Sequence, residues 1–291
     1  MLERTYHIKT PPEPAIEWNA YEKIIYEEWN DLLNRESNTE NDLQSFFERH
    51  PSMLPGAFQL IGNESGHYPW FCGVISQPIL PSYDRRIPDF MWLSMNSCAE
   101  EPVLIEIENT NKRWFTKKGN QSAQLTQALN QIAEWKAWFS ESRNVEAFKA
   151  FYGLDRESWY CRQFHPSYLL IYGRKKEANA NTQLTTKRYF LQSDDVIIMT
   201  YDRLRPNQNA SQLVSMKLNQ NGYKALEVPP TIKWSPILAK ERALLSDLDN
   251  AILSNKYISK KRKDFLVRRL PYWNEWAKKI DTGLINAADV E

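Results

Sequence analysis

The chain has 291 residues, 42% of them apolar, so it can bury a sizeable core in one large domain or in a core with appendages. Its 37 Lys and Arg against 36 Asp and Glu give no overall sign of nucleic-acid binding, and any basic surface must be local. The three cysteines, Cys72, Cys98 and Cys161, lack C-x-x-C spacing, no apolar run is long enough to span a membrane, and the N-terminus does not open a signal peptide; these features predict a soluble cytoplasmic protein with reduced thiols and no zinc site.

Two helices are predicted near the start of the chain, after a polar, Pro-rich arm over residues 1–14. Aromatic and aliphatic side chains recur every three or four residues over 15–35, which indicates an amphipathic helix with an apolar packing stripe. Thr39 stands at an N-cap position with Asp42 three residues later, so a second helix begins there. Pro51 ends it.

A hairpin is predicted next, beyond an irregular segment of short strands and loops over residues 52–86. Residues 88–93 and 103–108 read as strands, and the polar stretch 94–102 between them is turn-like. Such a hairpin places the start of its first strand beside the end of its second.

Three acids stand at that end of the hairpin. Glu106 and Glu108, two residues apart, point to the same face of their strand, and Asp89 at the start of the other strand could converge with them. Gathered carboxylates repel one another unless a cation or donors lie between them. Mg²⁺ or Mn²⁺ prefers such hard oxygen ligands and can activate water against a phosphodiester, which suggests phosphoryl hydrolysis. The alternative is an ordinary solvated edge strand, because an acid followed by Glu-x-Glu also occurs there.

A basic loop follows over residues 109–120. Its cationic side chains are Lys112, Arg113, Lys117 and Lys118. A solvated charge run is the ordinary interpretation, but beside the acids this loop could neutralise a nucleic-acid backbone.

Residues 122–140 form the clearest predicted helix. Its apolar side carries Leu125, Leu129, Ile132 and Phe139. A separate stripe at helical spacing carries Gln124, Gln127, Gln131 and Trp135. This stripe either donates hydrogen bonds toward the strand end or is an ordinary exposed face.

The next part of the chain predicts a mixed α/β core. Residues 167–173 and 196–201 are nearly continuous apolar runs, typical of strands buried on both faces, and 174–192 can hold a crossover helix between them. Residues 211–219 are predicted as a further helix.

The C-terminal part differs in composition. Residues 229–236, with three prolines, are predicted as a linker, and 236–280 have helical periodicity. Residues 256–279 carry nine Lys or Arg against two acids, Asp264 and Glu275. This excess could contact phosphates, or the tail could pack on the core or on another subunit through its Leu and Trp residues.

Several of these segments, taken in order, resemble the Shedu family of antiphage defence proteins, whose shared region is a PD-(D/E)xK-type nuclease domain. The resemblance covers about residues 36–205. It depends on Glu40-Asn41-Asp42-Leu43-Gln44-Ser45-Phe46-Phe47-Glu48-Arg49-His50-Pro51, Pro88-Asp89-Phe90, Ile105-Glu106-Ile107-Glu108, Gln131-Ile132-Ala133-Glu134-Trp135, Ile171-Tyr172-Gly173-Arg174 and Thr200-Tyr201-Asp202-Arg203-Leu204.

The resemblance implies an α/β fold with a restriction-endonuclease-like PD-(D/E)xK core, in which helices flank a mixed central sheet. We expect an N-terminal arm and helix over 1–35, the nuclease-like domain over 36–228, and a basic, Trp-containing helical extension over 236–291.

The resemblance also implies roles for individual residues. Glu40, Asp89 and Glu106 match the acids that gather a divalent ion in the family fold, and Gln131 matches the helix glutamine that contacts the site. Glu108 stands where the family has a lysine, which is a departure. A carboxylate there would serve as a second-metal ligand or general base, so that Asp89, Glu106 and Glu108 are the predicted metal ligands, and Lys112 or Lys136 could supply the missing positive charge.

The implied function is a cytoplasmic endodeoxyribonuclease, dependent on Mg²⁺ or Mn²⁺, that cleaves double-stranded DNA in defence against phage. The predicted catalytic set is Asp89, Glu106, Glu108, Glu40, Gln131 and Lys112, and the predicted nucleic-acid contacts are Lys112, Arg113, Lys117 and Lys118. A homo-oligomer, dimer or tetramer, is expected, and no membrane partner. The alternative, which the change at Glu108 leaves open, is a catalytically silent nuclease-fold module that binds nucleic acid or mediates assembly.

Overall fold

A computed structural model describes residues 13–35, 37–58, 60, 65–82, 87–154, 162–178, 182–219, 222–279 and 291. Most of the arm expected over 1–14, the end of the C-terminal extension over 280–290, and Cys161 lie outside these residues. Within them, no helix is both long enough and apolar enough to cross a bilayer.

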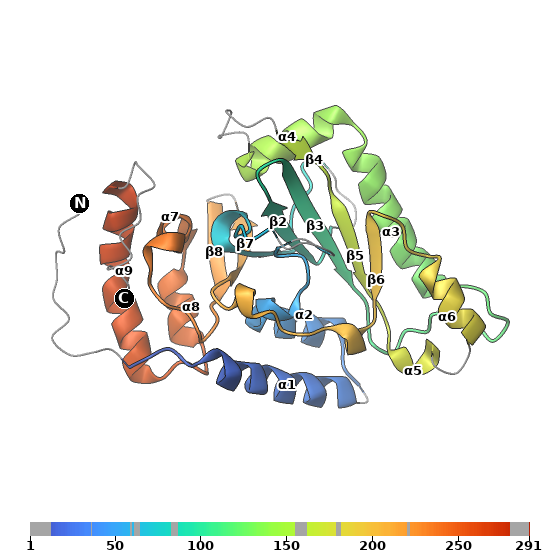
Figure 1. Ribbon diagram of the computed structural model, residues 1–291, viewed down its shortest axis with the longest axis horizontal. Helices are drawn as coiled ribbons and strands as arrows, with labels where there is room; N and C mark the ends of the chain where they lie inside the picture. The colour runs from blue at the N-terminus through green and yellow to red at the C-terminus, as the bar shows by residue number, and fades with distance from the viewer. Residues whose placement is uncertain are drawn as a thin grey trace.

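The described residues form helices around one mixed sheet (Figure 1). The helices are α1 (Trp18–Asn34), α2 (Glu40–Arg49), α3 (Ala123–Phe139), α4 (Ser142–Tyr152), α5 (Lys175–Ala178), α6 (Thr182–Tyr189), α7 (Ala239–Arg242), α8 (Leu248–Ser254) and α9 (Lys260–Lys279). The strands are β1 (Gly73–Ser76), β2 (Phe90–Met95), β3 (Ala99–Ile107), β4 (Gln163–Phe164), β5 (Ser167–Ile171), β6 (Val196–Met199), β7 (Val214–Asn219), β8 (Gly222–Glu227) and β9 (Leu245–Ser246). Their order is β6-β5-β3-β2-β1-β7-β8-β9, with β4 beside β3.

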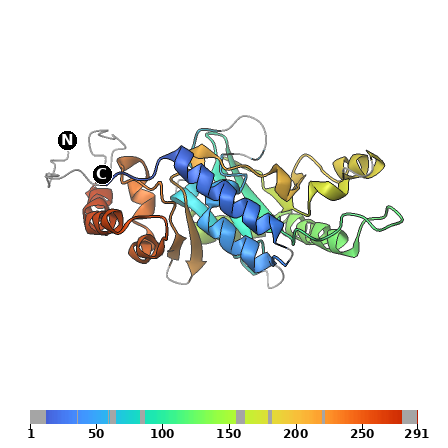
Figure 2. The ribbon, with the colours of Figure 1, turned by 90° about the horizontal axis from the view of Figure 1, so that it is seen from below.

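The central sheet is covered on both faces. Helices α1 and α2 lie side by side across one face (Figure 2), and their apolar side chains share a core with Val103, Ile105 and Ile107 of β3. Helices α3 and α4 cover the opposite face, where Leu104 belongs to a second core. Side chains alternate along a strand, so Glu106 has the same parity as Leu104 and belongs to the α3 face. The mixed α/β fold with flanking helices is therefore confirmed.

The two N-terminal helices form as predicted. Helix α1 buries Tyr21, Ile25, Trp29 and Leu32. Helix α2 begins with a complete capping box, in which Thr39 accepts from the Asp42 amide and Asp42 accepts from the Thr39 amide. The cap fixes the place where α2 starts, and Glu40 is its first residue.

The predicted hairpin is longer than expected. β2 and β3 pair antiparallel from Phe90↔Ile105 to Met95↔Glu100, so most of the stretch predicted as turn-like is strand. The turn is confined to the residues around Asn96, whose side chain accepts from the amides of Cys98 and Ala99. Asparagine supplied the turn chemistry and allowed both strands to extend through polar residues.

The two buried strands and their crossover are confirmed. β5 pairs parallel with β3 and with β6. The segment between β5 and β6 holds α5 and α6, which together with the loop after β3 extend beyond the sheet in Figure 1.

The helix predicted over 211–219 is wrong, because residues 214–219 form β7, paired parallel with β1 and antiparallel with β8. Val214, Met216 and Leu218 alternate with polar residues, which is a strand period. The pairing partners are distant in sequence, and their hydrogen bonds decided the outcome.

The C-terminal segment joins the main core. β9 adds a parallel strand beside β8, and Trp234, Leu266 and Trp273 are buried in the same cluster as the α3-face core. Residues 229–232 are buried, so this part of the predicted linker lies in the interior. The packing interpretation of the tail is confirmed, and helices α7 to α9 stand at the far end of the molecule from α6 (Figure 1).

Candidate active site

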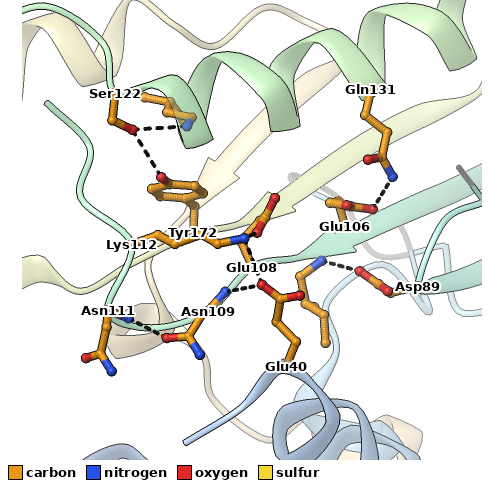
Figure 3. A network of polar contacts seen from close by, with 12 residues as sticks. Glu40, Asp89, Glu106, Glu108, Asn109, Asn111, Lys112, Ser122, Gln131 and Tyr172 are labelled. Atoms are coloured by element: carbon orange, nitrogen blue, oxygen red, sulfur yellow. Dashed lines mark hydrogen bonds and ion pairs between the residues drawn. The ribbon is translucent and has the colours of Figure 1, made fainter. Parts of the chain in front are cut away.

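Four acids gather where β2 begins, β3 ends and α2 begins (Figure 3). Asp89 immediately precedes β2, Glu106 lies in β3, Glu108 follows the last residue of β3, and Glu40 opens α2. The antiparallel hairpin puts Asp89 beside the end of β3, and the capping box sets the start of α2 near it. Four of the six residues predicted as catalytic are thus brought to one end of the sheet by three separate elements.

The Asp89 carboxyl is held against the end of β3. Its Oδ2 accepts from the Ile107 amide at 2.8 Å, and its own amide donates to the Ile105 carbonyl at 3.0 Å. Burial and the negative charges of Glu40 and Glu108 raise the pKa of Asp89 to about 7, although the Ile107 hydrogen bond acts in the other direction. This carboxyl is therefore close to half-protonated near neutral pH.

Glu106 is buried under α3, with 8% of its surface exposed. Gln131 Nε2 donates to Glu106 Oε2 at 2.8 Å (Figure 3). Gln131 and Trp135 are both buried, whereas Gln124 and Gln127 are exposed, so the contact with Glu106 comes from the buried part of the glutamine stripe. The contact expected for Gln131 is present, and its catalytic role stays a prediction.

Lys112 joins two of the acids. Its Nζ lies 2.8 Å from Glu40 Oε1 and also forms an ion pair with Glu108, four residues earlier. Burial would raise the pKa of Glu40, but the hydrogen bond and charge of Lys112 outweigh it and lower that pKa. Burial raises the pKa of Glu108 in spite of Lys112, with Glu40 adding to the rise. Lys112 thus supplies positive charge directly beside the Glu108 carboxylate.

The other candidate lysine lies elsewhere. Lys136 Nζ pairs with Asp195 at 2.7 Å, at the edge of the sheet next to β6. Of the two lysines that could compensate for Glu108, only Lys112 is therefore in contact with the acids. The remaining predicted nucleic-acid contacts, Arg113, Lys117 and Lys118, have exposed side chains along the loop that leads away from Lys112.

Sequence reasoning missed Tyr201 at this site. Its hydroxyl donates to the Glu108 carbonyl, and burial together with the charges of Asp89, Glu108 and Glu40 raises its pKa well above the usual value. Asn109 was also missed: its amide donates to Glu40 Oε1 at 3.2 Å, and its side chain donates to the Asn38 carbonyl at 2.7 Å. Tyr201 lies within the segment Thr200-Tyr201-Asp202-Arg203-Leu204 that carried the family resemblance, which was the available signal.

The loop that carries Lys112 packs closely against Gly173. Gly173 has φ +56°, and a Cβ there would come within 2.9 Å of the Lys112 carbonyl and 2.8 Å of Trp114 Nε1. Only a residue without a side chain permits this close approach in a left-handed conformation. The adjoining Arg174 pairs with Asp202 at 2.9 Å and donates to the Leu33 carbonyl at 3.0 Å, which ties the strand ends to α1.

The donor chemistry of the site suits a hard divalent cation, because four carboxylates lie near the same strand ends, and burial together with the charges of Glu40 and Glu108 raises the pKa of Asp89. Their present arrangement does not yet suit it. Glu106 is engaged by Gln131 and Glu108 by Lys112, and among the described residues no three His, Cys, Asp or Glu side chains converge as metal ligands. Asp89, Glu106 and Glu108 would have to reorient to share an ion.

Comparison with known proteins identifies the family of the chain. No curated protein matches the chain. The family model described as "Shedu protein SduA, C-terminal" matches residues 37–204. This match begins just before α2, ends just after Tyr201, and so contains the four acids, Lys112 and Gln131. Because it spans more than half of the 291 residues, the chain belongs to the Shedu family.

Proposed function

We propose that this protein is a metal-dependent DNA endonuclease of antiphage defence, built on a PD-(D/E)xK-type core. Membership of the Shedu family suggests the defence role. The site residues suggest phosphodiester hydrolysis, because carboxylates, a buried glutamine and a lysine meet at the end of two sheet strands.

The position of Lys112 is the observation that carries this proposal. Without a positive charge, Glu108 would repel a phosphate that approaches Asp89 and Glu106. Lys112 is four residues after Glu108 in the sequence, and its side chain contacts both Glu108 and Glu40. The charge that the family pattern places on the strand is thus supplied from the following loop.

Asp89, Glu106 and Glu108 would hold Mg²⁺ or Mn²⁺, which supplies Lewis-acid activation of water and phosphate when bound. The residues of the chain have their own tasks. Gln131 orients Glu106 through its hydrogen bond, and the Ile107 amide orients Asp89. Lys112 neutralises charge on the phosphate as it approaches, while Arg113, Lys117 and Lys118 contact the backbone of double-stranded DNA.

The test is cleavage of supercoiled and linear plasmid by the purified full chain, in chelator, Mg²⁺ or Mn²⁺. Glu106→Gln keeps the size of the side chain and its acceptor for Gln131, so it should fold and yet lose at least about a hundredfold in cleavage rate. Glu101→Gln is the matched control, because Glu101 lies near the other end of the same strand. Activity equal in both variants would refute the assignment.

The second candidate is a catalytically silent module that binds DNA or mediates assembly. The observation in its favour is the engaged state of the acids, with Lys112 bonded to Glu108 and no metal cluster preformed among the described residues. Divalent-ion titration separates the two. A silent module keeps its DNA affinity in chelator and never nicks DNA in either metal, whereas the nuclease regains cleavage when the metal is restored.

A further inference from the structure

Helix α6 and the basic loop after β3 form one surface beyond the acids. Lys187 Nζ of α6 donates to the Gly119 carbonyl of the loop at 3.0 Å. The Arg188 guanidinium lies 5.3 Å from the centre of the Trp114 ring. A groove of about 750 Å³ runs between the two segments, lined by Phe115, Gly119, Gln121, Lys187, Phe190 and Leu191 among others.

The two segments that form this surface contain basic residues and no acidic ones. Neither residues 109–121 nor residues 182–192 contain an Asp or Glu. Together the two segments carry Lys112, Arg113, Lys117, Lys118, Lys187 and Arg188. Four of these side chains, those of Arg113, Lys117, Lys118 and Lys187, are exposed. Local charge of one sign in a protein of nearly balanced total charge indicates a polyanionic ligand.

Two aromatic rings stand beside these cations in solvent. Tyr189 is 69% exposed and Phe190 is 75% exposed, the largest values among the large hydrophobic side chains of the described residues. Their rings are 5.5 Å apart at 82°, so they present faces in two directions. No described residue of α6 is buried, and Phe190, the next residue, is exposed as well, so these rings do not anchor the helix to the core. Leaving two aromatic side chains in water is unfavourable unless a ligand covers them.

The chemistry favours a nucleic acid over a second copy of the chain as that ligand. Protein interfaces are depleted in lysine at their cores, whereas this one would bury the rings among Lys117, Lys118 and Lys187. Aromatic rings among cations are the arrangement that binds unpaired nucleotides, with bases stacked on the rings and phosphates near the cations. Paired bases are already stacked inside the duplex and cannot use such rings.

The surface is continuous with the acid cluster. A second hollow of about 510 Å³ is lined by Asn109, Lys112, Arg113, Phe115, Ser122 and Gln124 among others. It shares Phe115 with the first groove and includes Lys112, which contacts Glu108 and Glu40. A strand that lies in both hollows therefore runs from the acids to α6.

We propose that Tyr189 and Phe190, framed by Lys117, Lys118 and Lys187, stack on unpaired bases, so that the substrate of this protein is DNA with a single-stranded segment next to the cleaved duplex. This inference rests on the proposed function, since it names the substrate of the same site. The duplex contacts the acids and the basic loop, and the unpaired segment extends along the groove to α6.

The test compares the full chain with a Tyr189→Ala/Phe190→Ala double variant. Both rings are highly exposed, so the variant should keep its melting temperature and circular dichroism spectrum. The probes are a fluorescently labelled oligothymidylate, a blunt duplex, and a single strand that carries 2-aminopurine. Phe151→Ala, which removes a 42% exposed ring from α4, is the matched control.

We expect the double variant to bind the single strand about five- to a hundredfold more weakly and the blunt duplex almost normally. It should also lose the quenching of 2-aminopurine that stacking causes. Lys117→Gln/Lys118→Gln should weaken both DNAs and reduce the salt dependence of binding. Phe151→Ala should change none of these.

Unchanged affinity and quenching in the double variant would overturn the inference, and a simultaneous loss of the wild-type oligomer in light scattering would assign the rings to self-association. If the wild type cleaves plasmid with metal but shows no such dependence on Tyr189 and Phe190, only this inference fails. A wild type that neither binds nor cleaves any DNA would remove the proposed function, and the inference with it.

Discussion

Replacing Asp89 with Asn should stabilise the folded protein at alkaline pH. Burial and the charges of Glu40 and Glu108 raise the pKa of Asp89 from 3.8 to about 7. A carboxyl whose pKa is higher in the folded state opposes folding when it is ionised. That cost is absent below the unfolded pKa, grows as the pH rises toward 7, and is then constant.

The magnitude follows from the shift. About three pKa units at about 1.4 kcal/mol each give an upper limit of about 4 kcal/mol at pH 8. Asn can still accept from the Ile107 amide, but its own amide group needs partners that a carboxylate does not, at a cost of about 1–2 kcal/mol. We therefore expect Asp89→Asn to gain about 1–3 kcal/mol at pH 8 and nothing, or a small loss, near pH 4.

Urea unfolding of wild type and variant in chelator, at several values between about pH 4 and pH 8, measures this difference. The control is Glu101→Gln on the same hairpin, whose difference in unfolding free energy from the wild type should not change with pH. A gain that does not depend on pH, or a loss that grows as the pH rises, would refute the reasoning.

Divalent metal extends the same experiment. If Asp89 holds the ion, Mn²⁺ or Mg²⁺ at about a hundred times its dissociation constant should add about 2.7 kcal/mol to the wild type and little to Asp89→Asn. The advantage of Asp89→Asn at pH 8 would then nearly disappear or reverse. An equal response of the two proteins to metal would show that Asp89 is not a ligand.

Three further results are expected. Gly173→Ala should lower the free energy of unfolding by about 2–4 kcal/mol in urea titration, because its Cβ would collide with the Lys112 carbonyl. Gly66 has a similar φ and open space around it, so Gly66→Ala should cost only about 1–2 kcal/mol. Equal losses would show that the contact with Lys112 does not matter. Burial would raise the pKa of Asp202, but Arg174 and the Lys175 amide outweigh burial and lower that pKa. Asp202→Asn should therefore lower the free energy of unfolding by about 1–2 kcal/mol at pH 7, and by progressively less as the pH falls below about 4. A loss independent of pH would contradict this. Lys112→Gln should slow metal-dependent plasmid cleavage by about ten- to a thousandfold, whereas Lys136→Gln should leave the cleavage rate unchanged. A slower rate in Lys136→Gln alone would assign the compensating charge to Lys136.

Local chemistry made much of the fold readable in advance. The capping box of Thr39 and Asp42 fixes the start of α2, and the aliphatic run of β5 requires burial on both faces. These signals depend on neighbours in the sequence, so they do not need the rest of the molecule. The candidate acids could be predicted from local pattern too, since the alternation of side chains along a strand puts Glu106 and Glu108 on one side.

Long-range packing decided the rest. Residues 214–219 became β7 because β1 and β8 offer hydrogen bonds on both sides, and the C-terminal segment joined the core because Trp234 and Trp273 are buried in it. The choice of Lys112 over Lys136, and the presence of Tyr201 under Glu108, likewise depend on which strand ends meet in space. The sequence by itself determined which residues could carry charge and where α2 begins, because these are properties of short segments. Only the tertiary structure decided which charges meet, because the contacts between them join segments up to about a hundred residues apart, and packing of the whole core sets their distances.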